Sequence, residues 1–141
     1  MKKLGISIFI LLTAITSYFA FSQLNKNDEL GEITITVVDE IGDTISSTQY
    51  PFTEDDTLFS ILAENYDVGC ADSSYHLSDV CEKQVFNSRI ILKIDTIETD
   101  WHNTYISIYE NGEYSNLGID SIILNDGDVF LFKYTVVGDG E

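Results

Sequence analysis

The sequence DWHNTYISIYENGEYSNLGIDSIILNDGDVFLFKY, residues 100–134, carries the clearest fold information in the chain. It contains the only tryptophan and two glycine turns, Asn-Gly at residues 111–112 and Asp-Gly at residues 126–127. Between the turns lie segments rich in Ile, Tyr, Phe and Val. Such segments bounded by glycine turns predict strands, and their succession here predicts a β-meander. Residues 129–136 (VFLFKYTV) are apolar on both faces, which is typical of a central strand.

Two strands joined by a turn are predicted ahead of this stretch. Residues 32–38 (EITITVV) alternate between apolar side chains and threonine, which predicts a strand with one buried face. Residues 39–43 form the turn, in which Gly42 can take a positive φ. Residues 44–52 (TISSTQYPF) return as the second strand, and Pro51 marks its end or a sheet edge because proline has no amide donor.

One helix is predicted after these strands. Asp56 or Thr57 supplies its N-cap, and the acidic residues 54–56 lie where the helix dipole favours them. The helix is expected to end near Tyr66. Its apolar residues have the spacing of a face that packs on a sheet: Leu58, Phe59, Ile61 and Leu62. A further strand is predicted over residues 88–94.

The two cysteines, Cys70 and Cys81, lie in residues 67–87, a polar segment that predicts a loop without strands. An even number of cysteines in an exported chain favours a disulfide, which would pin this loop and contribute roughly 2–3 kcal/mol to folding. The alternative is a metal site formed with the intervening Asp72, His76 and Asp79. That set lacks the second close pair of ligands usual in zinc sites, so we predict the disulfide and no metal.

The N-terminal segment predicts export. Lys2 and Lys3 precede an uncharged run over residues 4–22, which resembles a secretory signal peptide cleaved after Ser22. The run is also close to the ~20 residues that span a bilayer, so an uncleaved membrane anchor stays open as the alternative. We therefore expect an extracellular or cell-surface protein, which meets the membrane through residues 1–22 alone.

The rest of the chain is expected to form one domain. Hydrophobic residues make up 44% of the 141 residues, which is enough for a core. Residues 23–31 read as a polar tether, residues 32–137 as the domain, and residues 138–141 as a frayed tail.

The charge of the chain excludes one class of partner. The formal net charge is −17, from 7 Lys+Arg and 24 Asp+Glu, and such a surface repels phosphate backbones, which excludes nucleic acid as a partner. The two histidines, His76 and His102, lie far apart in the sequence and neither accompanies a known nucleophile motif. Paired cysteines would leave no thiolate to act as a nucleophile. We therefore expect no enzyme.

Aromatic residues are the most suggestive candidates for a binding site. Trp101, Tyr105, Tyr109 and Tyr114 can gather on one sheet face or at its rim, where rings with polar tips suit flat ligands and protein interfaces. In the alternative interpretation, Trp101 plugs the core and the tyrosines pack beneath the cysteine loop. The residues alone leave both interpretations open.

The order of these segments resembles a known family. The helix TLFSILAENY, the run W-x3-YISIY-x-NG, the segment GIDSIILNDGD and the last strand VFLFKY are similar to the transcobalamin-like C-terminal domain, found in bacterial exported proteins of unknown function. The resemblance spans most of residues 32–137. It implies an α+β fold, in which a β-grasp-like mixed sheet carries one packed helix, here with a disulfide-pinned loop.

The resemblance also implies a function. In cobalamin carriers, the related domain closes over the corrinoid against a larger helical barrel, which this chain does not contain. We therefore expect a non-catalytic binding module that needs no cofactor, binds cobalamin, another corrinoid or a similar flat ligand, and uses a partner protein to complete the site. The implied contacts are Trp101, Tyr105, Tyr114, Asn116 and Gly118, of which Gly118 serves backbone geometry. The alternative is a cell-surface protein-interaction domain with no small-molecule ligand.

Overall fold

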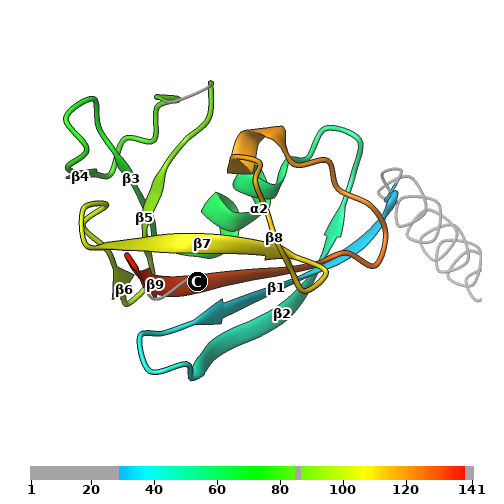
Figure 1. Cartoon of the computed structure of the whole chain (residues 1–141). Helices are drawn as coiled ribbons and strands as arrows, with labels where there is room; N and C mark the ends of the chain where they lie inside the picture. Colours follow the sequence, from blue (N-terminus) through cyan, green and yellow to red (C-terminus); the bar gives the residue numbers. More distant parts are fainter. Residues whose placement is uncertain (1–28, 85–86, 139–141) are drawn as a thin grey trace, which may run out of the picture.

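The computed structural model describes residues 29–84 and 87–138. The predicted signal or anchor, residues 1–22, and most of the tether lie outside the described residues. Within those residues, two β-sheets share one α-helix (Figure 1). No helix in this part of the chain is long and apolar enough to cross a membrane.

The larger sheet has five strands in the order β2-β1-β9-β7-β8. Its strands are β1 (Gly31–Val38), β2 (Thr44–Phe52), β7 (Thr104–Glu110), β8 (Glu113–Tyr114) and β9 (Val129–Val136). Strands β1 and β9 run parallel, with Ile35 opposite Phe130, and the other pairs are antiparallel. The sheet is therefore mixed, and β9 is central, as the sequence predicts.

The helix α2 (Leu58–Asn65) packs on one face of this sheet. Alternate residues of the two central strands are fully buried against it, as period-two geometry requires. These are Ile33, Ile35 and Val37 on β1 and Phe130 and Phe132 on β9. From the helix come Leu58, Ile61 and Leu62. Burying each such side chain contributes about 1.5–3 kcal/mol, so this α+β, β-grasp-like core confirms the predicted fold class.

The N-cap of the helix is Thr57 rather than Asp56, the other predicted cap. The Thr57 hydroxyl accepts a hydrogen bond from Ser60 N at 3.0 Å, and the Ser60 hydroxyl accepts one from Thr57 N at 2.8 Å. This reciprocal pair satisfies two backbone donors that a helix start leaves free. Asp56 instead accepts a hydrogen bond from Thr53 N, which closes the turn before the helix.

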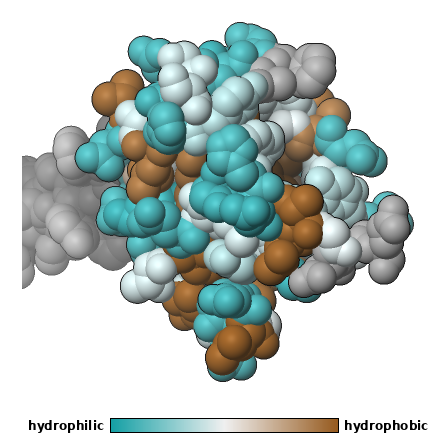
Figure 2. Space-filling model, turned by 60° about the vertical axis from the view of Figure 1, so that its left-hand side comes forward, coloured by the Kyte–Doolittle hydropathy of each residue, from teal (hydrophilic) through white to brown (hydrophobic). Residues whose placement is uncertain are grey.

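Most apolar side chains that remain at the surface are dispersed. The most exposed are Ile41 and Ile123, both at 79%. Figure 2 shows one face of the molecule, on which apolar side chains lie in small groups among hydrophilic ones.

The smaller sheet corrects the prediction of a loop over residues 67–87. Its order is β4-β3-β5-β6, and it contains β3 (Val68–Ala71), β4 (Leu77–Ser78), β5 (Ile91–Ile94) and β6 (Ile97–Glu98). Strands β3 and β4 both lie in the segment predicted to have none. They are too short to show a periodic pattern, and β3 is held by pairing with the distant β5, where Cys70 lies opposite Ile91.

The predicted disulfide is confirmed. Cys70 and Cys81 are bonded, with 5.1 Å between their Cα atoms. Cys70 is fully buried on β3 and belongs to the core, so it does not lie in a polar loop as predicted. The bridge therefore ties the segment after β4 directly to the core.

The prediction of a β-meander over residues 100–134 is wrong. Strand β7 lies between β8 and β9, because the chain leaves β8 after two residues and returns on the other side of β7. The second glycine turn is not a hairpin turn. It docks on the start of β1, where Glu32 N donates to Asp126 Oδ1 at 2.9 Å and Gly127 N donates to Glu32 O at 2.8 Å.

Candidate functional site

A cavity of about 470 Å³ lies beside β7, between this strand and residues 88–91. Its third wall is the strap, which we define as residues 115–121 and which includes the 3-10 helix η1 (Ile119–Ser121). The volume is within the range of small-molecule sites. All five predicted contact residues line it: Trp101, Tyr105, Tyr114, Asn116 and Gly118.

Trp101 is presented by a tight loop organised around Asp100. The Asp100 carboxylate accepts hydrogen bonds from His102 N at 3.0 Å, Asn103 N at 2.8 Å and Thr104 N at 2.9 Å. The hydrogen bond from the Asn103 side chain, followed by those from Asn103 N and Thr104 N, holds the pKa of Asp100 well below its usual range. Trp101 itself has φ +65°, a left-handed conformation that is uncommon for a bulky residue.

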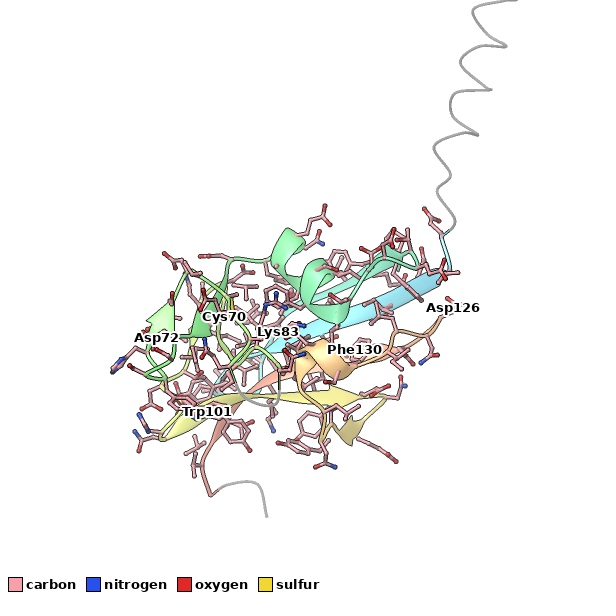
Figure 3. All side chains as sticks on the ribbon, turned by 90° about the horizontal axis from the view of Figure 1, so that it is seen from above. Cys70, Asp72, Lys83, Trp101, Asp126 and Phe130 are labelled. Carbon is pink, nitrogen blue, oxygen red and sulfur yellow. A yellow bond between two sulfur atoms is a disulfide. The ribbon has the colours of Figure 1, made fainter. Side chains whose placement is uncertain are left out.

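Tyr75 is presented in the same way by a second loop. The Asp72 carboxylate accepts hydrogen bonds from Ser74 N at 2.8 Å and His76 N at 3.0 Å, and these bonds lower the pKa of Asp72. Tyr75 has φ +62°. Its ring stacks on Trp101, with 6.1 Å between the ring centroids and 7° between the ring planes. Figure 3 labels Asp72 and Trp101 at the same end of the molecule.

This stack decides between the two interpretations of Trp101. The indole is 39% exposed at the rim of the cavity, so Trp101 does not plug the core. Tyr75 was not among the residues predicted for the site. Its place between the two cysteines, three residues after an aspartate that can form a local turn, is the signal that could have indicated it.

The tyrosines divide between the cavity and the sheet. Tyr105 is half-buried on β7, and Tyr114 is 52% exposed on β8. Burial, followed by the charges of Tyr114 and Tyr109, raises the pKa of Tyr105 above the ordinary tyrosine value. Tyr109 packs edge-to-face on Tyr114, with 5.7 Å between ring centroids, and does not line the cavity.

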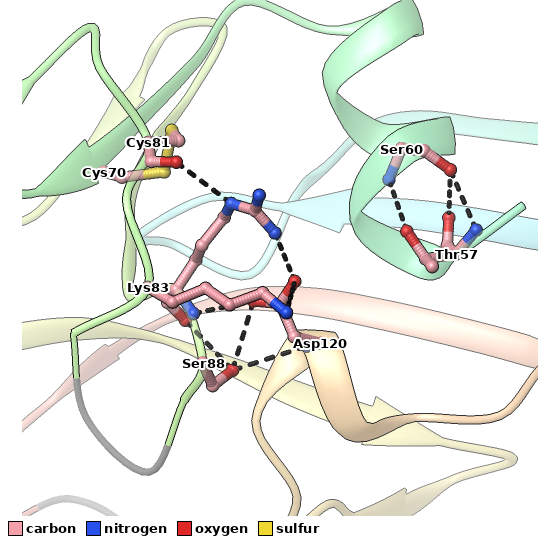
Figure 4. Close-up of polar contacts among 8 residues, drawn as sticks. Thr57, Ser60, Cys70, Cys81, Lys83, Ser88 and Asp120 are labelled. Carbon is pink, nitrogen blue, oxygen red and sulfur yellow. Dashed lines mark hydrogen bonds and ion pairs between the residues drawn. A yellow bond between two sulfur atoms is a disulfide. The ribbon is translucent and has the colours of Figure 1, made fainter.

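The strap is anchored through Asp120, whose side chain is only 5% exposed. Its carboxylate accepts a hydrogen bond from Arg89 N at 2.7 Å and pairs with the Arg89 guanidinium. Arg89 Nε donates to Cys81 O at 3.0 Å, and the guanidinium carbon lies 4.0 Å from the centre of the Phe59 ring. These contacts link the strap to the disulfide and to the helix, and Figure 4 shows the hydrogen bonds that reach Cys81 and Asp120.

Gly118 allows the strap to approach the opposite wall of the cavity. Its φ of −69° is available to any residue, so its conformation does not require glycine. A Cβ at this position would lie 2.3 Å from Ser88 Oγ and 2.6 Å from Ser88 Cβ, far inside van der Waals contact. The predicted backbone role of Gly118 therefore rests on close packing. Asn116 is exposed on the strap and lines the cavity mouth.

The lining is apolar with uncharged polar groups. The polar side chains are Ser88, Ser107, Ser115, Asn116 and Ser121, and the charged one is Arg89, which Asp120 neutralises. Over residues 29–84 and 87–138, no group of three or more His, Cys, Asp or Glu side chains is placed to hold a metal ion. The arrangement provides aromatic surface and neutral hydrogen bonds.

Comparison with known proteins identifies two solved structures with a similar fold. A candidate metal-binding protein from Ruminococcus gnavus ATCC 29149 has a TM-score of 0.51 and 22% identity, over 75% of this chain and 97% of that one. Haptocorrin in complex with Cbi has a TM-score of 0.52 and 14% identity, over 76% of this chain but 26% of haptocorrin. These similarities concern the fold, and the chain spans about a quarter of the length of haptocorrin.

No curated protein sequence matches the chain significantly. Residues 55–136 match the family described as "Domain of unknown function (DUF4430)", and the chain belongs to this family, which agrees with its resemblance to transcobalamin-like C-terminal domains.

Proposed function

We propose that this protein is a non-catalytic, extracellular binding module that holds a flat ligand at the cavity beside β7, with a corrinoid as the favoured ligand. The observation that carries the proposal is the convergence of Trp101, Tyr105 and Tyr114 on one cavity, with Tyr75 stacked behind Trp101. These four residues come from two loops and two strands: Tyr75 precedes β4, Trp101 precedes β7, Tyr105 lies on β7 and Tyr114 on β8.

The stacked pair suits a planar ligand. Trp101 and Tyr75 both have strained left-handed backbones, each held by an aspartate, so the two rings are fixed before any ligand arrives. Fixing a binding surface in advance reduces the entropy lost on binding. Rigid aromatic rings at a rim are also typical of residues that contribute most to binding energy.

The corrinoid class is supported by the fold. Haptocorrin, which shares this fold, was solved in complex with Cbi, and the resemblance to cobalamin carriers favours a corrinoid, whose ring is flat. The present chain corresponds to a quarter of haptocorrin, so one face of such a ring would stay open. A partner protein would then cover that face. The disulfide supports a location outside the cytoplasm, where such bonds persist.

A titration tests this proposal. Full-length protein is titrated with cobinamide, and binding is followed by the absorbance of the corrinoid and by the fluorescence of Trp101, the only tryptophan. We expect saturable quenching and a spectral shift. The Ile41→Ala variant serves as a control, because Ile41 is 79% exposed and does not line this cavity. Absence of binding at high micromolar cobinamide would contradict the proposal for the isolated chain.

The second candidate function is a cell-surface protein-interaction domain without a small-molecule ligand. The observation that favours it is the pair of exposed side chains at the cavity mouth, Tyr114 at 52% and Leu117 at 54%. Cross-linking on the cell surface, followed by mass spectrometry, would identify such a partner. The double variant Tyr105→Ala with Tyr114→Ala should lose it, and capture that is unaffected by both changes would count against this candidate.

A further inference from the structure

Ile106 is a backbone position in the cavity wall whose N–H and C=O have no hydrogen-bond partner among the described residues. Three hydrogen bonds fix the direction in which the peptide groups of β7 point. Asn103 O accepts from Val137 N beside β9, at 2.8 Å. On the opposite side, Ile108 O accepts from Ser115 N at 2.8 Å and Thr104 N donates to Asp100 at 2.9 Å.

Peptide groups alternate between the two sides of a strand. Ile106 lies midway between Thr104 and Ile108. Its backbone N–H and C=O therefore point away from β9 and toward the cavity that Ile106 lines. Strand β8 pairs only with Tyr109 and Glu110 and does not reach Ile106. In residues 29–84 and 87–138, no hydrogen-bond partner lies on this side of Ile106, so one N–H and one C=O are available to a ligand.

We propose that this position recognises a carboxamide on the rim of the ligand, and that the site rejects carboxylates. The proposal rests on the proposed function, because it specifies the chemistry of the ligand at the same cavity. A carboxamide has one acceptor oxygen and two donor hydrogens, so it can pair with both the N–H and the C=O of Ile106. A carboxylate has only acceptors and would face the Ile106 carbonyl with like partial charges.

The charges around the cavity favour the same ligand chemistry. Arg89, the charged residue in the lining, already binds Asp120 and donates to Cys81 O. On the far side of residues 114–117, Glu110 and Glu113 line a neighbouring hollow, and they would repel an anionic group. The whole chain carries a net charge of −17. A ligand with uncharged groups on its rim therefore fits the site better than a ligand with carboxylates there.

A single amide fits this position better than an extended peptide strand. A peptide that joined the sheet would need free positions at every second residue of β7. Thr104 and Ile108, the neighbours of Ile106 on this side, are already bonded to Asp100 and Ser115. The free position is thus one residue long, which matches a side-chain carboxamide of a small ligand.

Two corrinoids with the same ring test the proposal. Full-length protein is titrated with cobinamide, whose rim carries carboxamides, and with cobyrinic acid, whose rim carries carboxylates. We expect cobinamide to bind at least about tenfold more tightly, since an unpaired buried polar group commonly costs this much. Equal or tighter binding of cobyrinic acid would overturn the proposal while leaving the proposed function standing. Binding of neither compound would remove the proposed function as well.

Amide hydrogen exchange provides a test at Ile106 itself. In the free protein we expect the Ile106 amide to exchange faster than those of Tyr105 and Ser107, which point toward β9. Saturating cobinamide should slow exchange at Ile106 by at least about tenfold and leave the two neighbours unchanged. If cobinamide binds without protecting Ile106, the assignment of this position is wrong.

Discussion

The indole of Trp101 lies parallel to the phenol ring of Tyr75, with 7° between the planes, although 26 positions separate the two residues in the chain. One ring belongs to the loop between β3 and β4, and the other to the loop between β6 and β7. The disulfide Cys70–Cys81 encloses the first loop, so the bridge and the stack together fix one end of the cavity.

Replacing Trp101 should separate binding from folding. We expect Trp101→Ala to weaken cobinamide binding about tenfold or more, because the ring lines the cavity and is fixed in advance. The free energy of unfolding should change by less than about 1 kcal/mol, since the ring is 39% exposed at the rim. Corrinoid absorbance and urea denaturation measure the two quantities. Unchanged affinity would exclude Trp101 from the site.

Removing the disulfide should loosen the rim of the cavity without unfolding the larger sheet. The double variant Cys70→Ala with Cys81→Ala should lose roughly 2–3 kcal/mol in the free energy of unfolding, because the bridge closes a short loop. The Trp101 indole should also become more exposed to solvent as Tyr75 is released, and its fluorescence emission should shift accordingly. Urea denaturation and the emission maximum give the two measurements. Two free thiols in exported protein, detected by mass spectrometry, would show that the bridge is not native.

The elements that the sequence predicted correctly are those with local causes. The alternation in residues 32–38, the capping residue Thr57, and the glycine at residue 112 each act within a few positions. The predictions that failed depend on distant partners. Strand β3 forms because Cys70 lies opposite Ile91, and the second turn docks on β1 through a contact 94 positions away.

The residues of the candidate site also fall into two groups, those that were predicted and those that were not. The family resemblance indicated five residues that line one cavity, whereas Tyr75 and Arg89 were not predicted to belong to the site. Tyr75 acquires its role from the disulfide and the stack. Arg89 acquires its role from the buried carboxylate of Asp120, 31 positions away. Both relationships exist only once the two sheets have formed.

Enlarging Gly118 should deform the cavity. In Gly118→Ala, the new Cβ would lie 2.3 Å from Ser88 Oγ, so the strap must move outward. We expect a loss of about 1–3 kcal/mol in the free energy of unfolding, as is usual for overpacking, together with weaker cobinamide binding. The double variant Gly118→Ala with Ser88→Gly removes the clashing atoms and should recover part of the stability. Equal stability of Gly118→Ala and the original chain would contradict the close packing.

Neutralising Asp120 should lower the free energy of unfolding strongly, whereas neutralising Asp67 should change it little. In Asp120→Asn, the Arg89 guanidinium loses its carboxylate in a site where Asp120 is 5% exposed. We expect a loss near the lower end of about 3–5 kcal/mol, because Arg89 is partly exposed. Asp67 pairs with Lys93 at 2.6 Å but is 70% exposed, so Asp67→Asn should change stability little. Urea denaturation of both variants makes the comparison, and similar losses would contradict the buried role of Asp120.

The loop that presents Trp101 should be sensitive to acid through Asp100. Hydrogen bonds from Asn103 and Thr104 lower the pKa of Asp100 in the folded chain, below the ordinary aspartate value of 3.8. A lowered pKa contributes stability that is fully present above 3.8 and is lost as the pH falls toward the folded value. We therefore expect Trp101 fluorescence to be constant down to pH values near 4 and to change below them. The Asp100→Asn variant cannot make this transition and should show the altered fluorescence at neutral pH. An acid transition of the same size in both proteins would show that another group controls the loop.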